Sequence, residues 1–156
     1  MKKLFSIILG LVCAAGLVFA ISGCDKEGEN EGTITNTMVL AGTTYEFELV
    51  MYHEGHGGPD FYHLDCETKN SVYHGHGEFP KSWVGKTTNL EKGEFFEEFN
   101  PQEGASYKPI IKSGTIKITE TEKGLHIVVD AVETSGDAFK MNVLAEDESK
   151  IDWNQR

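Results

Sequence analysis

From Thr33 to the C-terminus, apolar and polar residues alternate with a period of two, and this pattern limits the fold more than any other feature of the sequence. Successive side chains of a β-strand point to opposite faces of its sheet, so alternation predicts strands with one buried face. Clusters rich in Gly, Asn, Lys and Thr interrupt the pattern, as turns do. We expect seven strands, near residues 35–40, 44–52, 61–66, 72–79, 114–120, 125–131 and 139–145.

Seven short strands joined by turns predict an all-β fold, in which an antiparallel sheet forms a β-barrel or a β-sandwich. Residues 80–112 are the exception, because Phe95, Phe96 and Phe99 lie among glutamates without a clear period. That stretch is compatible with a short helix or with an aromatic loop. We expect residues 33–156 to form a single β domain.

The chain begins with a segment that is typical of a secretory leader. Lys2 and Lys3 precede a long uncharged run, which could also span a membrane as a helix. Cleavage is favoured by Ile21-Ser22-Gly23-Cys24. These residues resemble the lipobox of bacterial lipoproteins, a branched apolar residue and two small residues before a cysteine. The resemblance implies that residues 1–23 are a signal peptide and that the thiol of Cys24 is lipidated.

Residues 24–32 are expected to be a flexible tether, because no apolar side chain follows Cys24 in this stretch. Each buried methylene contributes about 0.8 kcal/mol, so the two or three acyl chains of such lipoproteins give a lasting membrane anchor. The acidic tether resembles the export signal of surface lipoproteins of Bacteroidota, which implies the outer membrane and the cell surface. Asp25 also resembles the inner-membrane retention signal of enteric bacteria, so the periplasmic face and the inner membrane stay alternatives.

Removal of the leader takes away Lys2 and Lys3 and leaves 12 basic against 25 acidic residues, a formal charge of −13. An acidic surface repels phosphate backbones, which argues against nucleic acid as a partner. Besides the lipidated Cys24, only Cys66 remains, so no disulfide can form within the domain. Cys66 alternates with Tyr62 and Leu64, and we therefore expect an inert core thiol in a monomeric domain.

The C-terminal half resembles the closing hairpins of small β-rich lipoproteins of Bacteroidota, many of which have lipocalin-like barrels or sandwiches and no assigned function. The resemblance rests on residues 113–119 and 124–130, and on residues 83–90 before them. It covers roughly half of the mature chain. It implies a lipocalin-like fold and a membrane address, and it supplies no active site.

Five of the six histidines lie within one short stretch of the chain. Residues two apart on a strand share a face, so His74 projects with His76, and His63 projects with Asp65. If residues 68–71 form a four-residue connection, Asp65 faces His74 and His63 faces His76, with Cβ atoms about 5 Å apart. This register predicts a patch of three imidazoles and one carboxylate.

Such a patch offers the nitrogen and oxygen donors that zinc, copper and nickel prefer. His53 and His56, which we place on a glycine-rich loop, are further candidate ligands. The alternative is that Gly55, Gly57, Gly58, Gly75 and Gly77 mark turns, and that the histidines are solvated residues on the outer face of a sheet. A slip by one residue would send His63 to the opposite face and remove the site.

The sequence contains no nucleophile elbow, phosphate loop, dinucleotide fingerprint or zinc-protease helix, so we do not expect an enzyme. The remaining catalytic hypothesis is metal-assisted hydrolysis with Asp65 or Glu78 as the base. We expect a membrane-anchored, non-enzymatic binding module for a ligand, a glycan or a partner protein. The alternative is a transition-metal-binding lipoprotein that uses His63, Asp65, His74 and His76.

Four aromatic residues could form a platform for a sugar or a peptide, namely Trp83, Trp153, Tyr107 and Phe61. Packing in the core or at its rim is the simpler explanation for each of them. A small barrel can also hold one apolar ligand or be filled by its own side chains, and the sequence leaves both open.

Overall fold

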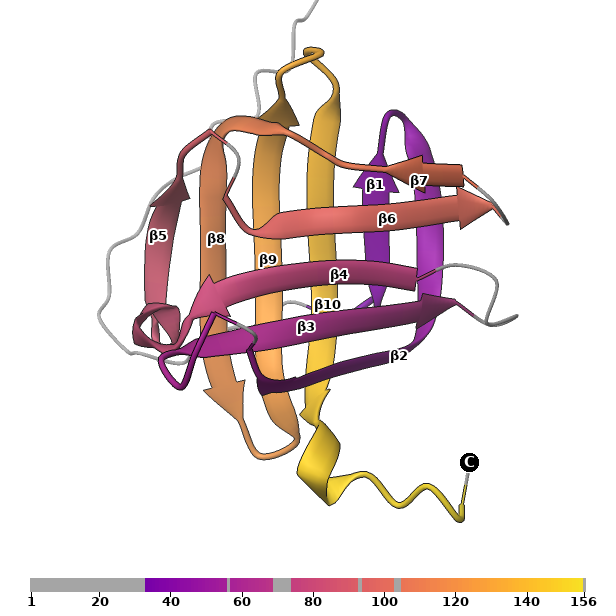
Figure 1. The fold of residues 1–156 in the computed structure, drawn as a ribbon, viewed down its shortest axis with the longest axis vertical. Helices are drawn as coiled ribbons and strands as arrows, with labels where there is room; N and C mark the ends of the chain where they lie inside the picture. The colour runs from indigo at the N-terminus through magenta and orange to yellow at the C-terminus, as the bar shows by residue number, and fades with distance from the viewer. Residues whose placement is uncertain (1–32, 56, 69–73, 93, 103–104, 156) are drawn as a thin grey trace, which may run out of the picture. The chain divides into compact units, whose positions relative to one another are not determined.

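The alternating stretches form the strands of one antiparallel sheet (Figure 1). The computed structural model describes residues 33–55, 57–68, 74–92, 94–102 and 105–155, which belong to one compact unit. Its strands are β1 Thr37–Leu40, β2 Thr43–Glu54, β3 Phe61–Thr68, β4 His74–Pro80, β5 Lys86–Leu90, β6 Phe96–Gln102, β7 Ala105–Tyr107, β8 Ile111–Thr121, β9 Gly124–Glu133 and β10 Ala138–Asp147. Two 3-10 helices, η1 Lys81–Trp83 and η2 Glu148–Lys150, complete the elements. Within these described ranges, no helix has the length and apolar character that crossing a membrane requires.

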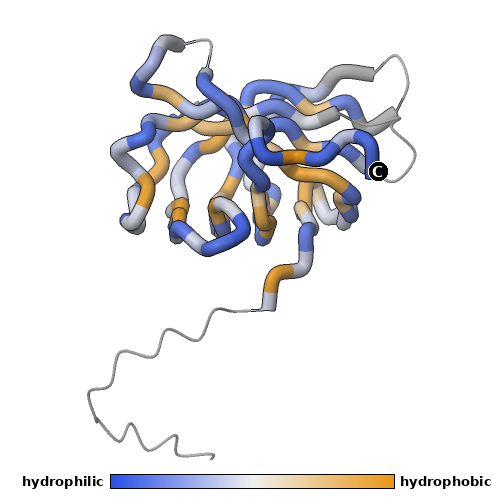
Figure 2. The backbone as a smooth tube through the Cα atoms, turned by 90° about the horizontal axis from the view of Figure 1, so that it is seen from below, coloured by the Kyte–Doolittle hydropathy of each residue, from blue (hydrophilic) through white to orange (hydrophobic). Residues whose placement is uncertain are grey.

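The all-β expectation is confirmed, and each of the seven expected strands is present. On β8, Ile116 and Ile118 are buried while Lys117 between them is exposed. Figure 2 shows the same alternation of hydrophobic and hydrophilic residues along the strands. The expected leader, the lipidation site and the tether lie outside the described residues.

Residues 80–112, for which the sequence left a short helix or an aromatic loop open, hold η1 and three further strands in their described part. Phe96 and Phe99 on β6 are both buried although they are three residues apart, since the register of β6 against β4 shifts between them. Such a β-bulge breaks the period of two by which a strand is found in a sequence. β5 carries one buried side chain, Leu90, and lies at the edge of the sheet.

The strands lie in the order β5-β8-β9-β10-β1-β2-β3-β4-β6-β7, and neighbours in this order are antiparallel. One further contact joins the end of β10 to β2 in parallel, at Glu146 opposite Met51 and Asp147 opposite Tyr52. In Figure 1, β3, β4 and β6 cross in front of β8, β9 and β10. The described strands leave the sheet open, with β5 and β7 as its edges.

The apolar core lies between the two crossing groups of strands. Phe96 on β6 and Phe139 on β10 pack with ring centroids 5.4 Å apart, which joins the front group to the back group. On β3, Leu64 and Cys66 point into this core and are 0% and 1% exposed. Asp65, between them, therefore points to the outer face of the sheet.

Candidate metal centre

β3 and β4 pair in a register that differs by two residues from the expected one. Asp65 lies opposite His76 and His63 lies opposite Glu78, whereas we expected Asp65 to face His74 and His63 to face His76. Glu67 pairs with His74 instead of Val72, so six residues instead of four lie between the last paired residues of the two strands. A shift by two leaves every side chain on its expected face, because the faces alternate with a period of two. His63, Asp65 and His76 therefore share the outer face.

His53 lies in a strand, and its placement on a glycine-rich loop is wrong. β2 continues to Glu54, two residues past the expected end, and His53 lies directly opposite His63. The alternation continues through Met51 and His53, whose neighbour Tyr52 packs against the core. That continuation is the sequence signal that could have placed His53 beside His63.

Two of the expected ligands fall wholly or partly outside the described residues. His56 lies entirely outside the described residues. For His74 the structure gives the backbone position, opposite Glu67. The described side chains that come together are Asp65, His53, His63 and His76, a set that we call the Asp65 cluster.

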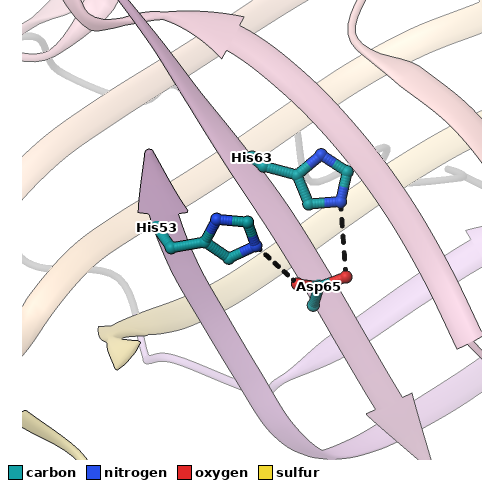
Figure 3. Close-up of side chains that lie close together, drawn as sticks. All are labelled: His53, His63 and Asp65. Atoms are coloured by element: carbon teal, nitrogen blue, oxygen red, sulfur yellow. Dashed lines mark hydrogen bonds and ion pairs between the residues drawn. The ribbon is translucent and has the colours of Figure 1, made fainter. Parts of the chain in front are cut away.

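Three imidazole nitrogens contact the carboxylate of Asp65. Nδ1 of His76 lies 2.7 Å from Oδ1, and Nε2 of His63 lies 3.4 Å from the same oxygen. Nε2 of His53 lies 3.2 Å from Oδ2. Figure 3 shows His53 and His63 reaching the carboxylate from neighbouring strands, and one ligand atom from each of these three residues lies within 4.8 Å of the others.

The Asp65 cluster is well shielded for a group on an outer face. The side chains of His63 and Asp65 are 12% and 18% exposed, and that of His53 is 29% exposed. Nδ1 of His53 donates to the backbone oxygen of Glu54 at 2.8 Å, since a carbonyl can only accept. This bond fixes the ring with Nε2 toward Asp65, as outer contacts of metal-binding histidines do.

Gly75 and Gly77 alternate with the histidines on β4, and the interpretation of these two glycines as marks of turns is wrong. A Cβ on Gly75 would lie 2.9 Å from Cζ of Phe96, and a Cβ on Gly77 would lie 3.1 Å from the backbone oxygen of Phe95. The missing side chains make room for the aromatic rings of the core. β4 therefore presents its two glycines to the core, next to Phe96, and it presents His76 to the outer face.

Glu78, one of the two residues considered as a catalytic base, supports the turn that joins β2 to β3. Its Oε1 accepts a hydrogen bond from the backbone N–H of Gly57 at 2.8 Å. A Cβ on Gly55 would lie 2.5 Å from the same oxygen. The other candidate base, Asp65, contacts three imidazoles. Both carboxylates thus have structural contacts that account for their positions.

The expected core position of Cys66 is confirmed, because its side chain is buried in the main apolar cluster. Burial raises the pKa of the thiol, and the charge of Asp65 adds to the effect. The thiolate is the reactive form of cysteine. Cys66 is therefore a packing residue.

The four candidate platform aromatics have different surroundings. Phe61 is half-buried at the start of β3, opposite Pro80 of β4. Trp83 packs against the core. Tyr107 donates its hydroxyl hydrogen to Glu133. Trp153 is 52% exposed and lines a groove together with Tyr52 and Tyr62. Core packing therefore accounts for Trp83 and leaves Trp153 unexplained.

Comparisons with family models, with characterised proteins and with solved structures find no match to this chain. No residue role can therefore be transferred from a relative. The donors of the Asp65 cluster, two or three nitrogens and a carboxylate oxygen, are those of zinc, copper and nickel sites. The chemistry of these donors indicates what the cluster can bind.

Proposed function

We propose that the protein is a membrane-anchored, non-enzymatic binding module whose domain captures one divalent transition-metal ion at the Asp65 cluster. The ligands are His53, His63 and Asp65, and His76 orients the carboxylate from the opposite strand. The observation that carries the proposal is the convergence of three imidazole nitrogens on one carboxylate, at 2.7 to 3.4 Å.

The spacing of the donors supports a metal ion. In a tetrahedral zinc site with bonds of about 2.1 Å, neighbouring donor atoms lie roughly 3.4 Å apart. The contacts of His53 and His63 with Asp65 are 3.2 and 3.4 Å long, and the first of them also has the geometry of a hydrogen bond. The contact of His76 is shorter, 2.7 Å, and has the length of a hydrogen bond to a carboxylate. His76 therefore fits an orienting role, and the other three residues fit the ligand role.

The protonation of His53 supports the same conclusion. Its Nδ1 carries a hydrogen, because it donates to the oxygen of Glu54. Where Nε2 carries no hydrogen, its lone pair points at the Asp65 carboxylate, and two acceptors repel one another. A proton or a metal ion between Nε2 and the carboxylate removes the repulsion. The binding experiment separates these two cations.

The mixed donor set favours zinc, copper and nickel over magnesium and calcium. Imidazole nitrogen suits the first group, whereas the second group prefers oxygen ligands alone. The three ligands also leave a coordination position for water or for a partner's side chain. A capture site with one open position is suited to taking up a metal and passing it on.

The membrane address in this proposal is supported by the sequence alone. Ile21 to Cys24 resemble a lipobox, and residues 25–32 contain no apolar side chain. In this proposal Cys24 carries the lipid, and the acidic tether places the domain at the outer membrane, exposed at the cell surface. The tether of eight residues spans roughly 16 Å as a random coil, enough to lift the domain clear of the headgroups.

Titration calorimetry tests the metal site. The full chain in detergent, freed of metal with a chelator, is titrated with zinc, copper(II) or nickel at neutral pH. We expect one equivalent of metal to bind. His53→Ala and His63→Ala should each weaken the affinity by more than about 100-fold, and His76→Ala by about 10- to 100-fold, as loss of an orienting contact does.

His126→Gln is the matched control, since His126 hydrogen-bonds Asn142 on the β9–β10 pair, away from the Asp65 cluster. It should bind metal like the wild type. Affinity should also fall on acidification, because protons compete for the imidazole lone pairs. Equal binding by the wild type and the His53→Ala/His63→Ala double variant would refute the site.

A further inference from the structure

A second surface feature lies at the end of β2 and β3, and His53 of the Asp65 cluster is among the residues that line it. It is a groove of about 510 Å³, and we call it the Trp153 groove. One wall is formed by Tyr52, Tyr62 and Lys81 of η1. The two tyrosines also pack against the core. The other wall is formed by η2 and Trp153 from the C-terminal segment, which leaves the sheet beyond β10 in Figure 1. Its volume lies in the range of small-molecule sites.

The C-terminal wall is held in place by the sheet. Asp147 pairs in parallel with Tyr52, which fixes the end of β10 beside β2. The carboxylate of Asp147 then caps η2, because it accepts hydrogen bonds from the N–H and the hydroxyl of Ser149 at 3.0 and 2.6 Å. The groove is thus bounded by a structured segment on each side.

Trp153 has no packing role that accounts for it. Its side chain is 52% exposed, the highest value among the exposed large hydrophobic residues of the described chain. Tryptophan is enriched at binding interfaces, where a ligand or partner covers its ring. Tyr52 and Tyr62 add two more rings to the groove, with centroids 4.8 Å apart and ring planes at 72°.

The charges of the groove are largely matched. Nζ of Lys81 lies 3.0 Å from Oε1 of Glu54, and Nζ of Lys150 lies 3.1 Å from Oδ2 of Asp147. A cationic ligand would find two of the three lining carboxylates, those of Glu54 and Asp147 but not Glu148, in these ion pairs, and it would find Lys81 already over the ring of Tyr62, at 4.9 Å from the centroid. An anionic ligand would meet these carboxylates in a domain of strongly negative charge.

We propose that the Trp153 groove binds an uncharged carbohydrate, with a pyranose ring packed on the indole of Trp153 and its hydroxyl groups bound to Lys81 and Glu54. The C–H faces of a sugar ring are apolar and pack flat on an aromatic ring. Its hydroxyls both donate and accept, so they can use an ammonium and a carboxylate that already form a pair. An uncharged polyhydroxylated ligand fits these features better than a cation, an anion or a purely apolar molecule.

The test uses the full chain in detergent and neutral oligosaccharides of four to six glucose, mannose, galactose or xylose units. Binding is measured by calorimetry and by protection of tryptophan fluorescence from acrylamide. We expect at least one of the four series to bind and to shield Trp153. Trp153→Ala should then weaken binding by at least about tenfold, as loss of a central aromatic contact does, and Lys81→Met should weaken it less.

Trp83→Phe is the matched control, because Trp83 packs against the core and does not line the groove. It should keep the affinity and, with Trp153 as the remaining tryptophan, should report the whole change in fluorescence. His63→Ala should also keep sugar binding, while Trp153→Ala should keep metal binding, so the two sites fail separately. The inference is overturned if none of the four series binds, if Trp153→Ala binds as well as the wild type, or if polylysine or heparin occupies the groove in their place.

Discussion

Glu133 is a carboxylic acid in the apolar core, with a side chain that is 1% exposed. It belongs to β9, on the same face as Val129 and Ala131, where the alternation calls for an apolar residue. The hydroxyl of Tyr107 donates to its Oε2 at 2.5 Å, and Oε1 has no hydrogen-bond partner among the described residues. A buried polar group is costly when it is left unpaired, so Tyr107 supports β9 from β7.

Tyr107→Phe should destabilise the protein by about 1 kcal/mol at neutral pH, because it removes the partner of Glu133. The hydrogen bond to Glu133, followed by burial, raises the pKa of Tyr107 to about 12. The unfolded chain loses this proton near pH 10. The advantage of the wild type over Tyr107→Phe is therefore complete below pH 10 and disappears as the pH rises from 10 to 12.

Denaturant unfolding of both proteins at pH 8, 10 and 12 measures this difference. A gap in unfolding free energy that stays constant over the whole range would contradict the proposed role of the phenol hydrogen.

Among the strands, β4 has to meet a different packing requirement on each of its two faces. Outward, His76 binds Asp65 of β3, and inward, Gly75 and Gly77 leave space for Phe96 of β6. The strand is therefore specified by its neighbours on both sides, and a substitution on one face should leave the other intact.

Gly75→Ala should destabilise the fold by about 1 to 3 kcal/mol, because overpacking displaces a core ring. The new Cβ would lie 2.9 Å from Phe96 and 3.1 Å from Phe99. Unfolding in urea gives the free energy, and Lys117→Ala, at an exposed position of β8, is the control and should change it by less than about 0.5 kcal/mol. Equal stabilities of Gly75→Ala and the control would show that Phe96 yields without cost.

The sequence predicted correctly which face of a strand each residue occupies, because this follows from alternation. It did not predict the lengths of strands and loops, and therefore not the register. The outer face shared by His63, Asp65 and His76 follows from alternation, which a register shift of two does not change. The register itself depended on the connection after β3, and composition does not fix the length of a loop. His53 was assigned to a loop because glycines follow it closely, although β2 includes it. The three phenylalanines of the 80–112 stretch showed no clear period because a β-bulge lies between Phe96 and Phe99.

For the molecule as a whole, the proposed anchor and the negative charge of the domain act together. Residues 24–156 carry a formal charge of −13, which favours solubility and repels anionic headgroups, so the proposed attachment would depend on the lipid. The two proposed sites meet at His53, which is a proposed metal ligand and also lines the Trp153 groove.

Cys24→Ser should leave the precursor without lipid and uncleaved by the lipoprotein pathway. In detergent phase partition of cells that express it, we expect the mature, acylated species to disappear. Cys13→Ser, within the leader, is the matched control and should process normally. The anchor proposal fails if Cys24→Ser still yields an acylated chain of mature length in the detergent phase.

The members of the Asp65 cluster lie close together in the sequence, and this affects the order in which the chain folds. Asp65 is separated by 12 residues from His53 and by 11 from His76, whereas the contact between Asn36 and Leu144 spans 108 residues. Short chain loops close at lower entropic cost and sooner than long ones. The hairpins of β2, β3 and β4 can therefore form while the C-terminal strands are still undocked. A metal ion present at that moment meets its ligands ahead of the finished core and can act as a clamp on the nascent meander.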